Sequence, residues 1–297
     1  MKVAFLIQCH KNADQVNKLI DRLSSSQDGY CTDFYVHVDA KSDIAKDIKR
    51  QDNVVVLSKR IDVKWGQISQ VDATLNLIEA AVGVKKDYDF LWLISGQDYP
   101  IKSNEEIVGF LKNNRGKNFI EVVSVDGDDH RRYLKRNQTW YPTWGASPVF
   151  IMRVLRKIYN ILTGGKYHSI IKRKNVLNAE WRFGSQWWTL TEEACKMIIE
   201  QSADGKYRQY FKNCICPDES YFQTMLWNSP LRATLTGNNL CYVDWSEHKK
   251  NPKVLDEGDF EKLTKSDKLI ARKFDAERSC GLIVKLDAGS IDKTCLE

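Results

Sequence analysis

The sequence Cys216-Pro217-Asp218-Glu219-Ser220-Tyr221-Phe222 sets two adjacent carboxylates directly behind a proline. It predicts the start of a short apolar helix, because proline suits the first helical position and acidic side chains there interact favourably with the helix dipole. A carboxylate held on such a turn can also act as a general base. The segment alone leaves both interpretations open, because this pattern is common at helix starts that carry no chemistry.

The composition is that of an ordinary soluble globular enzyme. The chain has 297 residues, of which 42% are hydrophobic and 28% are charged. The 9 Trp and 12 Tyr suit sugar or nucleotide surfaces and serve equally well in a core. A formal net charge of +6 favours phosphates, nucleic acid or an anionic membrane surface as partners, without choosing among them.

The cysteines and the N-terminus point to a reducing compartment. Of the 8 cysteines only Cys214 and Cys216 are close neighbours, and one such pair with no nearby histidine is a poor zinc site. We therefore expect free thiols. The apolar run at residues 3–7 is too short for a signal peptide or a membrane span, and it predicts a first strand. The expected location is the cytoplasm.

Strand and helix patterns alternate over the first 125 residues, which predicts an α/β fold with a mostly parallel central sheet flanked by helices. The predicted strands are residues 3–8, 34–38, 53–57, 90–94 and 119–123, and the predicted helices are residues 13–23, 44–48, 68–82 and 105–113. Beyond residue 126 the alternation stops. We expect a strand at 183–190, a helix at 191–201 and a C-terminal helix at 266–274. With no repeat or linker, residues 1–297 are expected to form a single domain with an elaborated C-terminal half.

Ligands of such sheets bind beyond the carboxyl ends of the strands, so residues 8–10, 38–41 and 95–98 are expected at the site. Asp39 could bind ribose or uracil, or could cap a helix. Trp65 could stack on a base or belong to the core. The sequence has no P-loop and no GxGxxG, so phosphate binding would depend on cations. The candidates are Lys249, Lys250, Lys253, Arg272 and Lys273.

Six segments together resemble one known family. In chain order they are His37-Val38-Asp39, Trp65-Gly66, Ser95-Gly96-Gln97-Asp98-Tyr99-Pro100-Ile101-Lys102, Gly184-Ser185-Gln186-Trp187-Trp188, Pro217-Asp218-Glu219 and Ala271-Arg272-Lys273-Phe274-Asp275. This order is similar to that of the core-2/I-branching β-1,6-N-acetylglucosaminyltransferase family, which includes the peptide O-xylosyltransferases. The resemblance runs over nearly the whole chain. Its Gly-Ser-Gln-Trp segment leans toward the xylosyltransferase-like and bacterial branch.

The resemblance implies a GT-A-type, Rossmann-like fold and an inverting transfer from a UDP-sugar, with no metal or other cofactor. Residues 1–125 would form the nucleotide-sugar-binding half, and residues 126–297 the acceptor-binding and catalytic half. Glu219 would be the catalytic base. The nucleotide-sugar-binding positions would be Ile7, Gln8, Cys9, Asp39, Ala40, Lys41 and Trp65, with Lys250 and Lys273 on the diphosphate. The acceptor-binding positions would be Glu121, Arg132, Trp187 and Trp245.

The implied donor is UDP-GlcNAc, and the implied acceptor is a hydroxyl of a glycan or a lipid-linked glycan. A bacterial enzyme of surface polysaccharide synthesis is expected, because the sequence shows no membrane anchor. Two alternatives stay open. The donor could be UDP-xylose, or the chain could be a non-catalytic protein that binds UDP-sugars or carbohydrate on the same scaffold.

Two further motifs compete with this interpretation. Asp126-Gly127-Asp128-Asp129 could hold Mn²⁺ or Mg²⁺, or could be a solvated acidic turn. The resemblance puts that loop near the acceptor, so no metal is expected. Cys9 and His10 are adjacent on a strand and would point to opposite faces, which disfavours a thiol nucleophile.

The segment from Arg153 to Lys174 combines apolar residues with many cations. It could rest on an anionic membrane, at the inner face of the cytoplasmic membrane, or it could be a packed helix with a solvated basic side. No nucleic-acid partner is expected, since the cations are scattered and no recognition motif is present.

Overall fold

A six-stranded sheet forms the centre of the computed structural model, which describes residues 1–24, 29–124, 131–141, 149–162, 172–249 and 251–291. The strand order is β3-β2-β1-β4-β7-β6. The first four strands in this order run parallel, and β7 lies antiparallel between β4 and β6. The strands are β1 (Lys2–Cys9), β2 (Cys31–Val38), β3 (Val54–Val56), β4 (Phe90–Ser95), β6 (Phe119–Ile120) and β7 (Trp188–Leu190).

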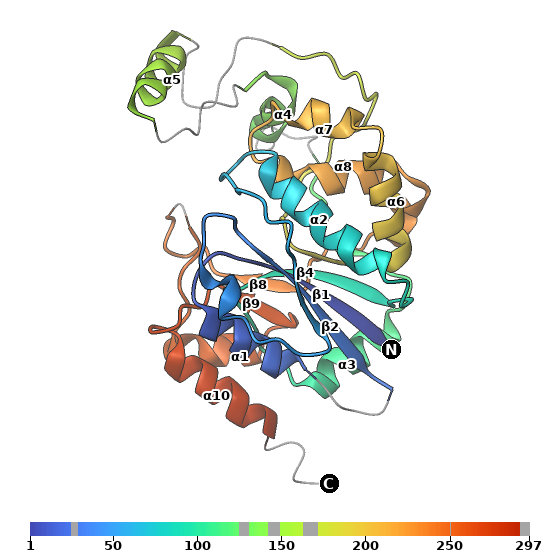
Figure 1. The fold of residues 1–297 in the computed structure, drawn as a ribbon, viewed down its shortest axis with the longest axis vertical. Helices are drawn as coiled ribbons and strands as arrows, with labels where there is room; N and C mark the ends of the chain where they lie inside the picture. The colour runs from blue at the N-terminus through green and yellow to red at the C-terminus, as the bar shows by residue number, and fades with distance from the viewer. Residues whose placement is uncertain (25–28, 125–130, 142–148, 163–171, 250, 292–297) are drawn as a thin grey trace.

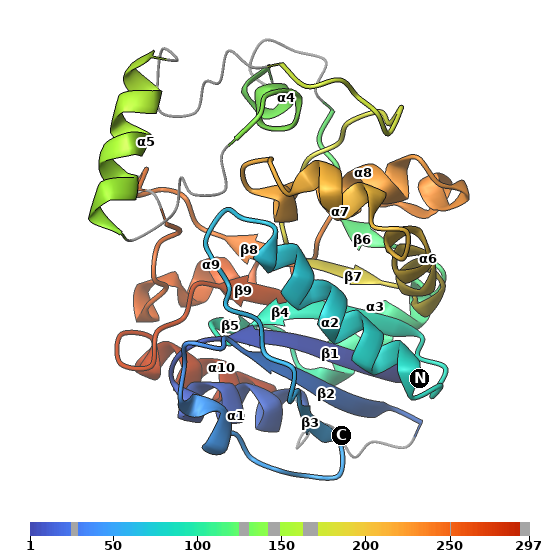
Figure 2. The ribbon, with the colours of Figure 1, turned by 45° about the horizontal axis from the view of Figure 1, so that its top comes forward.

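Helices cover both faces of this sheet (Figure 1 and Figure 2). One face carries α1 (Ala13–Leu23), α3 (Asn104–Asn113) and α10 (Cys280–Ile291). The opposite face carries α2 (Ser69–Gly83), α6 (Glu192–Ser202), α7 (Lys206–Phe211) and α8 (Tyr221–Trp227). The α/β fold with a mostly parallel sheet flanked by helices, as predicted from the sequence, is confirmed.

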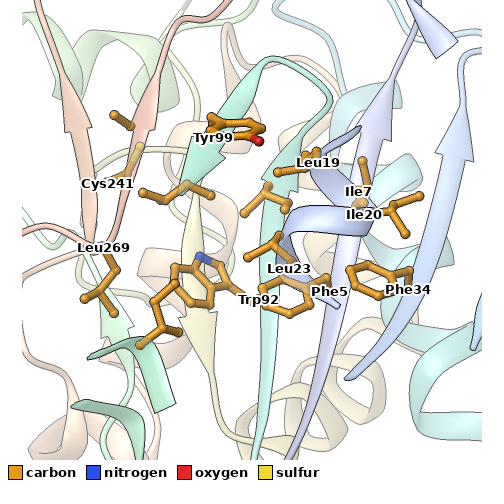
Figure 3. Packing of buried hydrophobic residues seen from close by; sticks show 14 of the residues in the cluster. Phe5, Ile7, Leu19, Ile20, Leu23, Phe34, Trp92, Tyr99, Cys241 and Leu269 are labelled. Carbon is orange, nitrogen blue, oxygen red and sulfur yellow. The ribbon is translucent and has the colours of Figure 1, made fainter. Parts of the chain in front are cut away.

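The apolar residues of β1 explain why both faces are covered. Phe5 points to the α1 side, where its ring stacks with those of Phe34 and Trp92 at centroid distances of 5.4 and 5.6 Å (Figure 3). Ala4 and Leu6 belong to the core on the α2 side. Successive strand residues point to opposite faces, so a strand that is apolar at every position has to be buried on both.

A second sheet of three strands lies beyond β4, in the order β5-β9-β8. It consists of β5 (Asp98–Pro100), β8 (Cys241–Val243) and β9 (Ile270–Arg272). The helix predicted at residues 266–274 is therefore wrong. Ile270 and Ala271 are apolar because β9 is the buried middle strand, antiparallel to β5 and parallel to β8. The last helix begins later, at Cys280.

The strands predicted around the second half of the main sheet are shorter than expected. Of the predicted strand 183–190, only Trp188–Leu190 forms β7, and of 119–123 only Phe119–Ile120 forms β6. Val123 and Phe183 still pair through an isolated antiparallel bridge. Between the bridge and β7 the chain leaves the sheet, and this departure frees residues 184–187 for the site described below.

The remaining elements are short or lie outside the layers. They are α4 (Arg131–Gln138), α5 (Phe150–Leu162), α9 (Phe260–Thr264) and the 3₁₀ turns η1 (Ile44–Lys46), η4 (Pro217–Glu219), η5 (Pro230–Thr234) and η6 (Glu257–Asp259). Within the described parts of the chain, none of the helices combines the length and the apolar character needed to cross a bilayer. The described cysteines are free thiols, as predicted, and all except Cys31 and Cys280 are buried.

We predict that Phe5→Ala lowers the free energy of unfolding by about 3–5 kcal/mol, because it leaves a cavity between two stacked rings in the core. Denaturant unfolding followed by circular dichroism measures the loss. Val55→Ala, at a 45% exposed position of β3, is the matched control and is expected to change stability by less than about 1 kcal/mol. Equal losses in the two variants would contradict the packing described here.

Candidate active site

The carboxyl ends of β1, β2 and β4 meet at one edge of the main sheet. The Asp39 N–H donates to the Cys9 carbonyl, and the Gly96 N–H donates to the Gln8 carbonyl, both at 2.9 Å. A Cβ atom on Gly96 would lie 2.9 Å from the Cys9 Cβ, so a residue without a side chain is needed for this approach. The predicted meeting of residues 8–10, 38–41 and 95–98 is confirmed.

The Gln8 side chain connects this edge to two other segments. Its Oε1 accepts from the Nε2 atoms of Gln70 on α2 and Gln186, at 2.8 and 2.9 Å, and its own Nε2 donates to the Thr74 hydroxyl. Gln8 is buried. A buried amide whose donor and acceptor are both used is costly to disturb, so it holds the Gly184–Trp188 segment against the end of β1.

Asp39 and Lys41 are bound to each other as well as to the surrounding loop. The Asp39 carboxylate accepts from the Lys41 N–H at 2.9 Å and from its ammonium at 3.1 Å, and the same ammonium also donates to Asp62 and to the Val63 carbonyl. Ala40 is held by its N–H, which donates to the Ile61 carbonyl. Lys41 therefore shapes the loop that presents Asp39, and its charge is already paired.

Two buried groups at the strand ends are held in their neutral forms. Burial lowers the pKa of His37 to about 4, and its Nε2 accepts from the Ile61 N–H. Burial also raises the pKa of the Cys9 thiol to about 12. A thiolate is the nucleophilic form of cysteine, so the environment of Cys9 disfavours thiol catalysis.

Glu219 is the last residue of η4, a separate 3₁₀ turn that Ser220 divides from α8. The sequence predicted that Pro217 to Glu219 form the first turn of the following helix, and the break at Ser220 corrects this. On one side of the turn the Cys216 N–H donates to the Gly66 carbonyl at 3.0 Å. On the other side the Gly184 N–H donates to the Glu219 carbonyl at 2.9 Å.

The side chain of Glu219 is partly exposed and forms an ion pair with Arg136 of α4. Arg136 Nη1 lies 2.5 Å from Glu219 Oε2. Among the described residues the other carboxylate oxygen, Oε1, has no hydrogen-bond partner. This leaves one oxygen anchored and one available to accept a proton, which is the arrangement that a general base requires.

Arg136 was missed by the sequence analysis, which chose Arg132 instead. Arg132 lies one helical turn earlier in α4, and its side chain lies outside the described part of the structure. Residues four apart share a helix face, so the pair of arginines was the available signal.

Asp218, the other carboxylate of the turn, has a different environment. Burial and then the charge of Glu219 raise its pKa to about 7. Its Oδ1 is buried and has no hydrogen-bond partner among the described residues. Two neighbouring carboxylates whose environments differ in this way are suited to different roles.

The segment after Gly184 carries one of the predicted acceptor positions, Trp187, and contacts another, Glu121. The Ser185 N–H donates to Glu121 Oε2 at 2.8 Å. Trp187 lies under the guanidinium of Arg272, whose Cζ is 4.3 Å from the ring centroid. Arg272 Nε in turn lies 3.6 Å from Asp98 Oδ1. Glu121 and Trp187 therefore border the same region as the ends of β4 and β9.

Lys273 supplies positive charge at this edge. Burial, followed by repulsion from Arg272 and Lys11, lowers the pKa of Lys273. Its ammonium makes no hydrogen bond or ion pair with the residues that the structure describes. It also acts electrostatically on His10, at the end of β1, together with Asp39. A bound anion would relieve this local excess of positive charge.

The two predicted tryptophans at the rim are exposed. Trp65 is 76% exposed, beside the Gly66 that contacts Cys216, and Trp245 is 54% exposed, two residues after β8. Exposed aromatic rings of this size are available for stacking on a sugar or a base. Core burial of Trp65, the alternative in the sequence analysis, is wrong.

Two predicted features lie outside the described residues, namely Lys250 and the Asp126–Asp129 cluster. Within the described ranges, His, Cys, Asp and Glu side chains form no group of three or more that could hold a metal ion. The described site therefore offers the Lys273 ammonium and one carboxylate oxygen of Glu219, neither of which has a partner among the described residues.

A model of the Core-2/I-Branching enzyme family matches residues 3–267. Xylosyltransferase 2 of Canis lupus familiaris is 26% identical over 255 residues, covering 83% of this chain and 27% of that protein. Xylosyltransferase 2 of Bos taurus is 25% identical over 312 residues, covering 97% and 33%. The chain thus spans a third or less of the length of these two relatives.

Solved structures also resemble the chain. Mouse xyloside xylosyltransferase 1 in its apo form superposes with a TM-score of 0.41 at 11% identity, covering 91% of this chain and 97% of that one. The galactosyltransferase LgtC, in complex with donor and acceptor sugar analogues, superposes with a TM-score of 0.40 at 8% identity, covering 97% and 96%.

We predict that Asp218→Asn removes a pH dependence of stability. A buried carboxyl whose pKa is raised stabilises the fold at low pH, and this contribution is lost as the pH rises through about 7. The free energy of unfolding of the variant should therefore rise relative to that of the unmodified chain between pH 5 and pH 8, as measured by denaturant unfolding. Glu193→Gln, at an exposed position of α6, is the control and should run parallel to the unmodified chain. Parallel curves for Asp218→Asn would contradict the assigned environment.

Proposed function

The chain belongs to the Core-2/I-Branching enzyme family, and from this premise we propose that it transfers a sugar from a UDP-sugar to a hydroxyl of a glycan acceptor. The observation that carries the proposal is the carboxylate of Glu219, with Oε2 held by Arg136 and Oε1 without a partner in the described structure. Family membership and the mostly parallel sheet agree with the GT-A-type fold that the sequence implied.

The proposed reaction is a single displacement with inversion. The acceptor hydroxyl gives its proton to Glu219 Oε1, and its oxygen attacks the anomeric carbon on the face opposite the UDP. The bond from that carbon to the diphosphate oxygen breaks, and UDP leaves with the bonding electron pair. An α-linked donor then gives a β-linked product. A positioned carboxylate base of this kind contributes about 10²–10⁴-fold to the rate.

The donor is proposed to bind across the ends of β1 and β2. Asp39, presented by the Lys41 loop, would accept hydrogen bonds from the nucleoside, and the exposed ring of Trp65 would stack against it. Ile7, Gln8 and Cys9 would line the floor, with Ala40 beside them. Lys273 would neutralise the charge that develops on the leaving diphosphate, with Lys250 as its proposed companion.

The acceptor is proposed to lie on the other side of Glu219. Glu121, Trp187 and the exposed Trp245 would contact it, and Arg132 is proposed as a further contact. Residues 1–125 would thus mainly serve the donor, and residues 126–297 the acceptor and the chemistry. We propose a lipid-linked glycan of a bacterial surface polysaccharide as the acceptor, met in the cytoplasm at the inner face of the membrane. The cationic segment from Arg153 to Lys174 would contact that surface.

UDP-GlcNAc is proposed as the donor, and UDP-xylose is the second candidate because the similar proteins named above are xylosyltransferases. A panel of UDP-sugars, scored by released UDP and by thermal shift, separates these donors. UDP binding without release of UDP from any donor would instead support a non-catalytic binding protein.

We predict that Glu219→Gln lowers sugar transfer or donor hydrolysis by about 10²–10⁴-fold, because the amide cannot accept the proton. UDP-induced thermal stabilisation should stay unchanged in the same variant. Glu193→Gln, the control, should keep full turnover, since its side chain is exposed on α6. Turnover by Glu219→Gln close to that of the unmodified chain would refute the proposed base.

We predict that turnover is unaffected by EDTA, since Lys273 rather than a divalent ion is proposed to stabilise the leaving diphosphate. In the same EDTA-treated assay, Lys273→Gln should reduce turnover by about 10²–10³-fold, the cost typical of removing one charge-stabilising donor. Loss of activity with EDTA and recovery with Mn²⁺ would contradict this part of the proposal.

A further inference from the structure

The positive charge of the chain is concentrated in one segment. Residues 131–179 contain 11 Lys or Arg and no Asp or Glu. The rest of the chain has 34 Lys or Arg against 39 Asp or Glu, a formal net charge of −5, although the whole chain carries +6. A segment that carries only positive charge, on a protein that is otherwise acidic, favours binding of an anionic partner.

The helix α5 in this segment carries an exposed apolar face. At roughly 100° per residue, seven of its thirteen positions fall on one arc of the helix. All seven side chains on this arc are large, apolar and between 40% and 75% exposed. They are Phe150, Ile151, Val154, Leu155, Ile158, Ile161 and Leu162.

Cations lie outside this arc, along its Phe150 edge. Arg153 and Lys157 are both exposed there, and the Arg153 guanidinium carbon is 5.9 Å from the centroid of the Phe150 ring. Lys172 and Lys174, further along the segment, are exposed as well. From the sequence, this segment could also be a packed helix with a solvated basic side. A packed helix would bury its apolar arc, and α5 does not.

The position of α5 fits a surface that lies beside the site. Figure 1 and Figure 2 both show α5 outside the layers of the fold, on the side toward which the parallel strands of the main sheet point. The candidate active site lies at that edge of the sheet. A flat partner that covers α5 would therefore lie on the same side of the molecule as the candidate active site.

We propose that α5 is a membrane-docking helix that lies in the interface of an anionic bilayer. Its apolar arc inserts among the acyl chains, and the exposed cations Arg153, Lys157, Lys172 and Lys174 bind lipid headgroups. At about 20 Å the helix is too short to cross a hydrocarbon core of about 30 Å, so it lies in the plane of the surface. This inference rests on the proposed function, in that it names a bilayer-embedded, lipid-linked glycan as the class of acceptor.

The charge and the apolar arc of α5 favour an anionic bilayer over a second copy of the chain or a nucleic acid. A second copy of the chain would bring two acid-free, cationic segments together, and like charges oppose that contact. Nucleic acid would satisfy the cations but would leave seven apolar side chains in water, because phosphate contacts use charged and polar groups. An anionic bilayer satisfies both faces of the helix at once.

Flotation of the full chain with lipid vesicles tests the proposal. The chain should float with vesicles of phosphatidylcholine and phosphatidylglycerol, and poorly with phosphatidylcholine alone. The double variant Ile151→Glu with Ile158→Glu should weaken binding to the anionic vesicles by about tenfold or more, because it removes buried apolar groups. Lys157→Glu should weaken it by about fivefold or more, and added salt should weaken it further.

Matched controls separate the helix from general changes in charge or hydrophobicity. Val284→Glu on α10 replaces an exposed apolar residue by Glu, and Lys112→Glu on α3 replaces an exposed Lys by Glu; both should float like the unmodified chain. Flotation of the double variant equal to that of the controls would overturn the proposal. So would a dimer, seen by light scattering, that the double variant abolishes.

Thermal shift with UDP on the same samples keeps this test distinct from that of the proposed function. All variants should retain the UDP response. Lipid binding without any thermal shift by UDP would contradict the proposed function but support the membrane-docking helix. A thermal shift by UDP without flotation would contradict only the proposal that α5 docks to a membrane.

Discussion

The geometry of the candidate site depends on one close approach of backbone to backbone, at Gly184. Its N–H donates to the Glu219 carbonyl at 2.9 Å, and a Cβ at this position would lie 2.0 Å from the Glu121 carbonyl oxygen. Three segments far apart in the chain therefore meet where no side chain fits. Two residues later Gln186 reaches the buried Gln8, so the turn that carries Glu219 is tied to the end of β1.

Electrostatics then gives different roles to groups that look alike in the sequence. Asp218 is buried within the turn, and its pKa is raised to about 7. Glu219 is partly exposed and paired through one oxygen to Arg136. Among the cations, Lys41 is already bound to two carboxylates, whereas Lys273 has no partner within the described structure. A carboxylate with one open oxygen and an ammonium without a partner are the two groups that the proposed displacement needs.

The spacing of apolar residues correctly predicted the strands and helices whose buried face is set by their own sequence. β1 and α1 were placed to within a residue, because the apolar spacing of each follows from the face it buries. β9 was predicted as a helix because its apolar character comes from pairing with β5 and β8, which lie elsewhere in the chain. For the candidate site, motif order singled out Glu219, Trp65, Trp187 and Lys273, and their roles there stay predictions. Motif order could not predict Arg136, which forms an ion pair with Glu219. The two residues are 83 positions apart in the sequence, and a local sequence pattern does not show which distant residues are in contact.

The central claim is that Glu219 drives a single displacement at the anomeric carbon. Its most direct test is the configuration of the product, read by proton NMR from the anomeric signal of the sugar first formed from an α-linked UDP-sugar. The measurement has to be made before the free sugar equilibrates, with whichever donor the chain turns over. The account predicts a β-configured product. An α-configured product would show retention and would contradict the role given to Glu219.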